Sequence, residues 1–104
     1  MAQFDVFENP NEETKQATPY LLDVQSELLD NLATRVVVPL VAASVMGKAI
    51  GHLNPKFTIG TATVFMSTAE LAGVAVRSLG DKVTSLKDQR HEIIAALDFL
   101  FTGF

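Results

Sequence analysis

The one strong helical periodicity in this chain lies close to its C-terminal end. From Leu86 to Phe101 the apolar residues recur at the three- and four-residue spacing of an amphipathic helix. Ser85 followed by Asp88 resembles a capping box, and Gly103 stands where a helix typically ends. The other apolar residues fall mainly in short runs between turn residues, which is typical of strands. The sequence therefore predicts a sheet followed by one terminal helix.

Six or seven short strands are expected before this helix. The candidate runs cover residues 3–7, 19–24, 35–40, 56–59, 61–68 and 74–79. Segment 42–53 is ambiguous, because Gly47 and Gly51 weaken its helical spacing, and we expect it to be irregular or to hold a short strand. Pro39 removes one ladder hydrogen bond, so the end of its strand is expected at a sheet edge or a bulge.

This order of elements predicts an α+β fold, namely a small, partly open antiparallel barrel with a C-terminal helix. A length of 104 residues suits a single domain, residues 1–104. Cysteine is absent, which excludes disulfides and thiolate metal sites and suits a reducing cytosol. Residues 1–13 lack the pattern of a secretory signal, and the longest apolar stretch, residues 36–46, is too short to span a bilayer. We expect a cytoplasmic protein with no membrane partner.

The charge balance disfavours nucleic acid as a direct partner. The formal net charge is −4. That balance disfavours a partner held mainly by phosphate contacts, because such binding needs clustered Lys and Arg. The acids are concentrated in residues 1–30, where Lys15 is the only base. The pattern indicates either an acidic solvated face or a surface that repels DNA and favours a protein.

Side chains for catalysis or metal binding are sparse. The two histidines, His52 and His91, are expected in a loop and on the helix, both exposed to solvent, so no metal site is predicted. No phosphate-binding glycine loop or nucleophile motif occurs, and no cofactor is expected. Arg35 enters an apolar strand, where we expect it to pair with Asp23 or Asp30. The residues alone thus predict a small α+β domain that binds rather than catalyses.

Residues 23–30, Asp-Val-Gln-Ser-Glu-Leu-Leu-Asp, resemble the CcdB family, which carries a closely similar stretch. Residues 38–40, 59–60 and 101–103 match in turn, as does the spacing to Gly80. The similarity spans essentially the whole chain and keeps the order of its elements. Together with the length, these matches are fairly specific for that family.

The resemblance implies a fold and a function. The fold is an SH3-like barrel with a C-terminal helix, shared with the MazF ribonuclease toxins. The function is that of a homodimeric, non-enzymatic toxin of a type II toxin–antitoxin system, as in plasmid maintenance, which binds the A subunit of DNA gyrase and traps its cleavage complex. A cognate antitoxin neutralises such a toxin with a disordered C-terminal tail. Such a toxin associates with DNA only indirectly, through the toxin–antitoxin complex that represses its own operon.

The resemblance also assigns contact residues. Gyrase binding maps onto Ser26, Leu28, Leu29, Asp98, Phe101, Thr102, Gly103 and Phe104. Antitoxin binding maps onto Glu8, Asn9, Val45 and Met46. The best-known members end in Trp-Gly-Ile where this chain has Thr-Gly-Phe, and they have Asn at the position of Asp98. Phe101 is expected to lie half in the core and half on the contact surface.

Two other functions fit the same fold. A MazF-like endoribonuclease would need an RNA-compatible groove with a cation near an acid–base group, and Arg35 and Arg77 are the only arginines in the expected strands. A barrel adaptor that binds a peptide in a groove would need no such chemistry.

Overall fold

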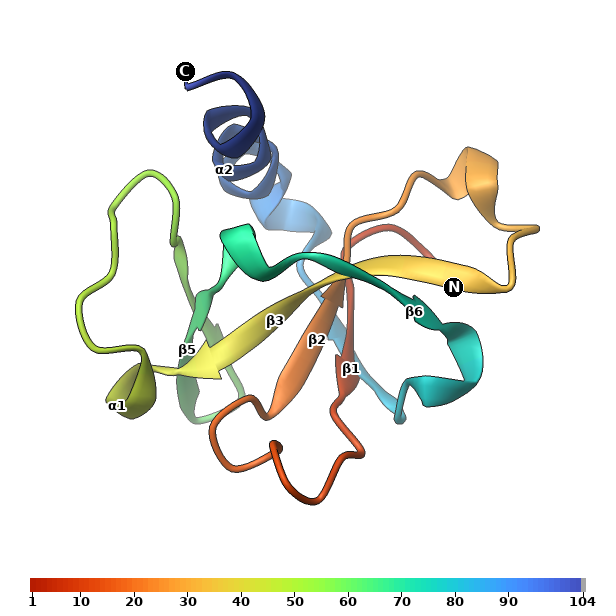
Figure 1. Ribbon diagram of the computed structural model, residues 1–104, viewed down its shortest axis with the longest axis horizontal. Helices are drawn as coiled ribbons and strands as arrows, with labels where there is room; N and C mark the ends of the chain where they lie inside the picture. Colours follow the sequence, from red (N-terminus) through yellow and green to blue (C-terminus); the bar gives the residue numbers. More distant parts are fainter. Residues whose placement is uncertain (104) are drawn as a thin grey trace.

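Seven antiparallel strands curl into one sheet over residues 1–103, the part of the chain that this computed structural model describes (Figure 1). The strands are β1 Asp5–Glu8, β2 Tyr20–Asp23, β3 Thr34–Ala42, β4 Lys56–Ile59, β5 Ala62–Met66, β6 Ala72–Ala75 and β7 Lys82–Ser85. They follow the order β4-β5-β3-β2-β1-β7, and β6 pairs with β3. Helix α2, Arg90–Thr102, comes after the last strand. The predicted α+β class, with a curled antiparallel sheet and one C-terminal helix, is confirmed.

Strand β3 is the centre of this sheet. One edge pairs with β2, and the other edge is shared, with Thr34–Val37 beside β6 and Leu40–Ala42 beside β5. Pro39 lies at the changeover between these two partners, and its carbonyl accepts a hydrogen bond from Ser67 N at 2.9 Å. The prediction of a sheet edge or bulge at Pro39 is therefore wrong. A central strand tolerates proline here because neither β5 nor β6 pairs with it.

The hydrophobic core lies inside the curl of the sheet. Val6, Leu22, Leu40 and Val64, from four different strands, are fully buried there together. Helix α2 adds Ile93 and Ala96 to the same cluster, while Ile94 and Leu97 pack against it from partly exposed positions. Part of the apolar stripe predicted for the helix, from Ile93 to Leu97, thus covers the core, whereas its last residue, Phe101, is exposed.

Three short elements differ from the sequence prediction. Segment 42–53 starts with Ala42, the last residue of β3, and then contains one helical turn, α1 Ala43–Met46, and no further strand. A strand was expected over residues 74–79, but the observed strand β6 is Ala72–Ala75, and the chain then continues as a 3₁₀ turn, Val76–Ser78. Strand β7 was not predicted, because three of its four side chains are exposed and give no alternation. Elements of one turn or four residues are decided by neighbouring strands more than by their own propensity.

The two ends of α2 also differ in how well they were predicted. Ser85 Oγ accepts from Lys87 N at 3.2 Å, but this bond begins a 3₁₀ turn, Lys87–Gln89, and the α-helix starts only at Arg90. The expected capping box is therefore wrong as the helix start. At the other end Gly103 has φ +80°, and its N–H donates to Phe99 O at 3.0 Å, which confirms the predicted C-cap. None of the helices in residues 1–103 is both long and apolar enough to cross a membrane.

Close backbone approach makes Gly80 a sensitive position. Its N–H donates to Glu8 O at 3.0 Å, and a Cβ built at Gly80 would lie 2.7 Å from that same oxygen. A Gly80→Ala substitution should therefore destabilise the fold by about 1–3 kcal/mol, because backbone atoms must move. Urea unfolding measures this change. Gly73→Ala is the control, since a Cβ there meets nothing within 4 Å. Equal stability of the two variants would show that strand β1 does not depend on this contact.

Candidate functional site

The turn between β2 and β3 carries three of the residues assigned to gyrase binding. Glu27–Leu29 forms a single 3₁₀ turn, and the Ser26 hydroxyl caps it by accepting from Leu28 N at 3.2 Å. No side chain within this turn is buried. Packing against the core therefore does not fix its conformation, so its shape depends on hydrogen bonds.

Three leucines on this turn face solvent. Leu28 is 93% exposed, and Leu29 and Leu32 are about half exposed. Leu32 N donates to Leu29 O at 3.2 Å, so the third leucine continues the same turn. Sequence reasoning did not include Leu32, although an apolar residue in a predicted turn was a usable signal. Clustered exposed leucines are typical of a protein-binding surface.

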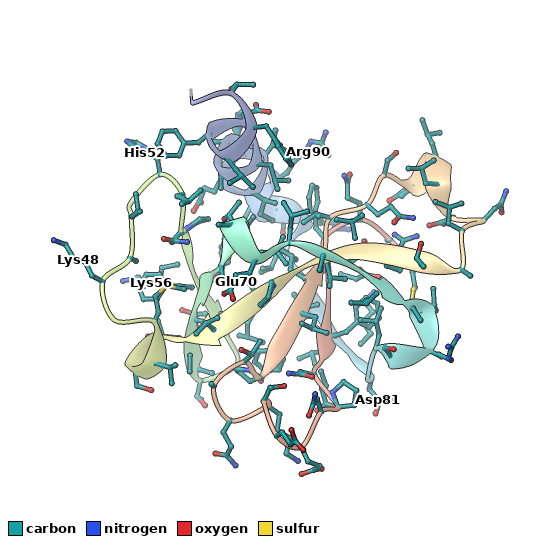
Figure 2. All side chains as sticks on the ribbon, in the orientation of Figure 1. Lys48, His52, Lys56, Glu70, Asp81 and Arg90 are labelled. Carbon is teal, nitrogen blue, oxygen red and sulfur yellow. The ribbon has the colours of Figure 1, made fainter. Side chains whose placement is uncertain are left out.

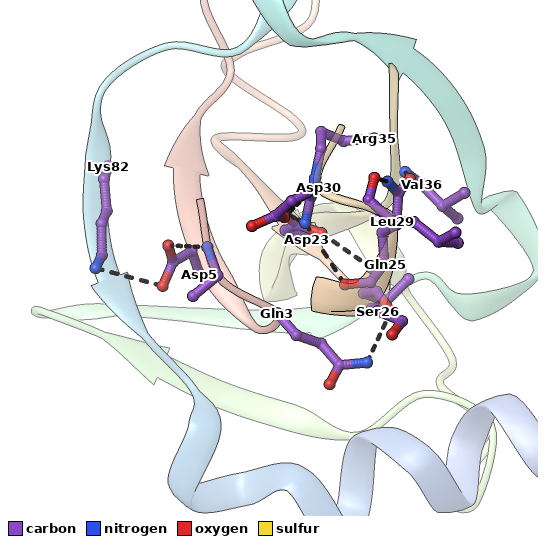
Figure 3. Close-up of polar contacts among 12 residues, drawn as sticks. Gln3, Asp5, Asp23, Gln25, Ser26, Leu29, Asp30, Arg35, Val36 and Lys82 are labelled. Atoms are coloured by element: carbon purple, nitrogen blue, oxygen red, sulfur yellow. Dashed lines mark hydrogen bonds and ion pairs between the residues drawn. The ribbon is translucent and has the colours of Figure 1, made fainter. Parts of the chain in front are cut away.

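A buried ion pair anchors the start and the end of this turn (Figure 3). The Arg35 side chain is only 1% exposed, and its Nη2 lies 2.7 Å from Asp23 Oδ2, while Nε donates to the same oxygen at 2.8 Å. Its Nη1 donates to Asp30 Oδ1 at 2.6 Å. Arg35 was expected to pair with Asp23 or Asp30, and it pairs with both. One guanidinium thus joins strand β2, strand β3 and the far end of the turn.

Gln25 makes a second connection between the turn and the sheet. Its side chain accepts from Val36 N at 2.9 Å through Oε1 and donates to Leu29 O at 2.9 Å through Nε2. Its backbone N–H donates to Asp23 Oδ1 at 3.0 Å. The residue is 5% exposed, so it does not itself form part of the outer surface.

Burial sets the protonation behaviour of the central pair. Desolvation raises the pKa of Asp23, and it outweighs the hydrogen bond from Gln25 N and the interaction with Arg35, which both lower that pKa. For Arg35, burial lowers the pKa, but the bonds to Asp30 and Asp23 outweigh burial, so its pKa is raised. The charged carboxylate of Asp23 is therefore costly to hold in the fold, and it depends on its partner.

The C-terminal end of α2 carries the other assigned residues. Phe101 is 69% exposed and is not among the residues of the core cluster, so the prediction that half of it lies in the core is wrong. Asp98 and Thr102 are exposed too, and the Thr102 hydroxyl donates back to Asp98 O at 2.7 Å. Phe104 lies outside the described residues.

A contact that sequence reasoning missed steadies this helix end. The ring of Phe99 lies 6.2 Å from the ring of His52, in the loop that follows α1, and the two planes are tilted by 53°. His52 is exposed beside α2 (Figure 2), as predicted for that histidine. Such a tilted aromatic pair favours one position of the loop against the helix.

The turn and the helix end do not form one patch within a single protomer. In Figure 1 the turn that precedes β3 lies at the right of the molecule, and the end of α2 lies at the upper left. The fold therefore presents two separate apolar groups, Leu28 with its neighbours and Phe101.

The residues assigned to antitoxin binding lie at one end of the sheet. Glu8 and Asn9 line a surface hollow of about 530 Å³ beside the loop that joins β1 to β2. That loop contacts the beginning of α1, since Ala42 N donates to Ala17 O at 2.8 Å, and α1 carries Val45 and Met46. Val45 is exposed, whereas the Asn9 amide group already bonds to Thr18 O at 2.8 Å. The geometry favours a contact role for Val45 and a loop-supporting role for Asn9.

Residues 1–103 hold no group of three or more His, Cys, Asp or Glu side chains placed to bind a metal ion. Arg35 is buried in its ion pairs and does not face a groove. The arrangement is suited to binding through exposed apolar side chains.

Removing Arg35 should test how strongly the ion pair holds this region. We expect Arg35→Met to lower the free energy of unfolding by about 3–5 kcal/mol, because the Asp23 charge then stays buried without a partner. Urea unfolding at neutral pH measures the loss. Adding Asp23→Asn should recover part of it, since the amide oxygen can still accept from Gln25 N.

Asp30→Asn is the matched control for this experiment. The Asp30 side chain is 47% exposed, so solvent already screens its charge, and we expect a loss below about 1 kcal/mol. Similar losses in the Arg35→Met and Asp30→Asn variants would contradict the dominant role of the buried pair.

Comparison with known families agrees with this architecture. A family model described as CcdB protein matches residues 3–103. The match covers nearly all of the 104-residue chain, including the β2–β3 turn and the whole of α2. The chain therefore belongs to the CcdB family, whose members are toxins of toxin–antitoxin systems that act on DNA gyrase.

Proposed function

We propose that this protein is a gyrase poison that binds the A subunit of DNA gyrase and traps the enzyme with its DNA cleaved. Family membership supports the target. The observation that carries the choice of surface is the exposure of large apolar side chains. Among the described residues these are Met1, Leu28, Leu29, Leu32, Val45, Ile50, Val83 and Phe101. Three of them, Leu28, Leu29 and Phe101, are residues that the resemblance assigns to gyrase.

We propose a homodimer that unites the separate apolar groups. A closed two-fold dimer doubles every contact and suits a target that is itself two-fold symmetric. Ile94 and Leu97 are only partly buried by their own core, and Phe101 is exposed, so α2 has apolar surface left for a second copy or for gyrase. Two helix ends brought together would form one larger contact surface.

We propose that the antitoxin neutralises the toxin by binding the end of the sheet that lies away from the β2–β3 turn and the end of α2. A disordered antitoxin tail can follow an extended path, and Glu8, Val45 and Met46 lie along the loop that joins β1 to β2 and the adjoining α1. The acidic loop also disfavours direct DNA binding, so we propose that the toxin associates with DNA only as part of its complex with the antitoxin. Because the proposed target, DNA gyrase, acts on bacterial DNA, we propose that the protein acts in the cytoplasm.

Binding without catalysis explains the arginines better than an endoribonuclease does. Arg35 is buried against Asp23 and Asp30, where it is unavailable to RNA phosphates. Asp30, the acid nearest to Arg35 in the sequence, is likewise occupied by its ion pair with Arg35. Arg77, the other arginine considered for this role, is exposed on the turn after β6. We therefore propose that the toxin is not an enzyme.

Phe101→Ala and Leu28→Asp test the proposed gyrase surface. Each should raise the toxin concentration that gives half-maximal DNA cleavage by the gyrase holoenzyme roughly 30-fold, as expected for a central interface residue worth about 2 kcal/mol. Their free energies of unfolding should stay within about 0.5 kcal/mol of wild type, because both side chains are exposed. Removing residues 103–104 should abolish poisoning in the same assay.

Val83→Asp is the matched control for an exposed apolar residue. Val83 is exposed on β7, which begins at the lower right of Figure 1, away from the turn and from the C-terminal end of α2. It should poison gyrase like wild type. If Phe101→Ala and Leu28→Asp behave like this control, the proposed surface is wrong.

The dimer is tested by dilution of the wild-type protein. Sedimentation velocity at micromolar concentration should give twice the monomer mass of 11.3 kDa, because the apolar surface left on α2 favours association. A stable monomer under those conditions would remove the dimer from the proposal and leave two separate contact groups.

A further inference from the structure

We infer that Gln25 is a positioning residue for partner binding: it holds the Ser26–Leu29 turn in the shape that presents Leu28 and Leu29. This inference rests on the proposed function, since it assumes that these leucines contact gyrase. Gln25 is 5% exposed and has almost no surface to offer a partner. Its influence on binding must therefore act through the turn.

Gln25 stands where the β2–β3 ladder stops. The last backbone bond of that ladder runs from Val24 N to Val36 O at 3.0 Å. One residue later the chain leaves the sheet for the turn, so Val36 N has no backbone partner in β2. The Gln25 Oε1 atom takes that place and accepts from Val36 N at 2.9 Å.

The other half of the same amide group reaches the turn. Gln25 Nε2 donates to Leu29 O at 2.9 Å, so a single planar group links the backbone of β3 to the end of the 3₁₀ turn. A primary amide supplies an acceptor and a donor side by side in this way, whereas an ionised carboxylate only accepts. Asparagine has the same group but is one methylene shorter.

The turn needs such a link because nothing else inside it is buried. Its internal bonds are short-range, from Leu28 N to Ser26 Oγ and from Leu29 N to Ser26 O. Two backbone contacts of Gln25 hold the start of the turn, from Arg35 Nη2 to Gln25 O at 3.5 Å and from Gln25 N to Asp23 Oδ1 at 3.0 Å. Apart from the Gln25 side chain, the far end of the turn is tied to the sheet by the Arg35–Asp30 pair, whose acid is half exposed. Without Gln25 the exposed leucines would sample more conformations, and binding would have to order them again.

Gln25→Met removes both amide bonds and keeps the length of the side chain. We expect roughly tenfold weaker poisoning of the gyrase holoenzyme, with lowered ¹⁵N order parameters at residues 27–29 in the free toxin. Gln25→Glu keeps an acceptor for Val36 N but, while ionised, loses the donor to Leu29 O. It should therefore lose turn order and potency in the same way.

Val64→Ala separates this effect from a general loss of stability. Val64 is fully buried in β5, which Figure 1 shows on the far side of β3 from the turn, so its truncation destabilises the core without touching the turn. It should poison gyrase at wild-type potency under conditions where both variants remain folded. Equal loss of potency in Val64→Ala and Gln25→Met would overturn the positioning role.

The remaining outcomes separate the two proposals. If Leu28→Asp is inactive but Gln25→Met keeps full potency or full order at residues 27–29, the gyrase surface stands and the role of Gln25 is wrong. If Leu28→Asp itself keeps full potency, the assigned surface is wrong, and the inference about Gln25 fails with it.

Discussion

The buried pair of Arg35 and Asp23 is the interaction on which the arrangement of this protein depends. It joins the ends of β2 and β3 where their ladder stops, and Arg35 also reaches Asp30 beyond the turn. Buried ion pairs contribute little net stability compared with an apolar replacement, but losing one partner is costly. Alternative registers of β2 against β3 would separate these charges inside the core. The pair therefore favours one register and one path for the turn.

Strand β3 extends this constraint to the rest of the sheet. It contacts β2 along one edge and both β5 and β6 along the other, so its position determines where three strands lie. The change of partner at Pro39 lets the sheet curl around Leu40 and Val64, and α2 then covers that core. The two apolar groups proposed for gyrase binding both project from this rigid centre, from the β2–β3 turn and from the end of α2.

Most of the regular structure was predictable, and the errors share a cause. The helix and the strands at residues 3–7, 19–24, 35–40 and 56–59 were placed within a few residues, because their apolar spacing is strong. The one-turn helix α1, the short strand β7 and the start of α2 were not. Each of these depends on a neighbouring strand or on a single capping bond, whose free energy is comparable with the differences in local propensity.

The sequence by itself determined the fold class, the family, and that Arg35 would pair with Asp23 or Asp30, because periodicity, a long matching segment and a lone arginine in an apolar strand are properties of the chain order. That Arg35 pairs with both acids at once was decided by the tertiary structure. The tertiary structure alone decided that Phe101 is exposed, that Pro39 lies between two strand partners, and that Gln25 bridges β3 to the turn. Exposure and hydrogen bonding depend on which distant segments meet, and a linear pattern records only the tendency of a residue to be buried.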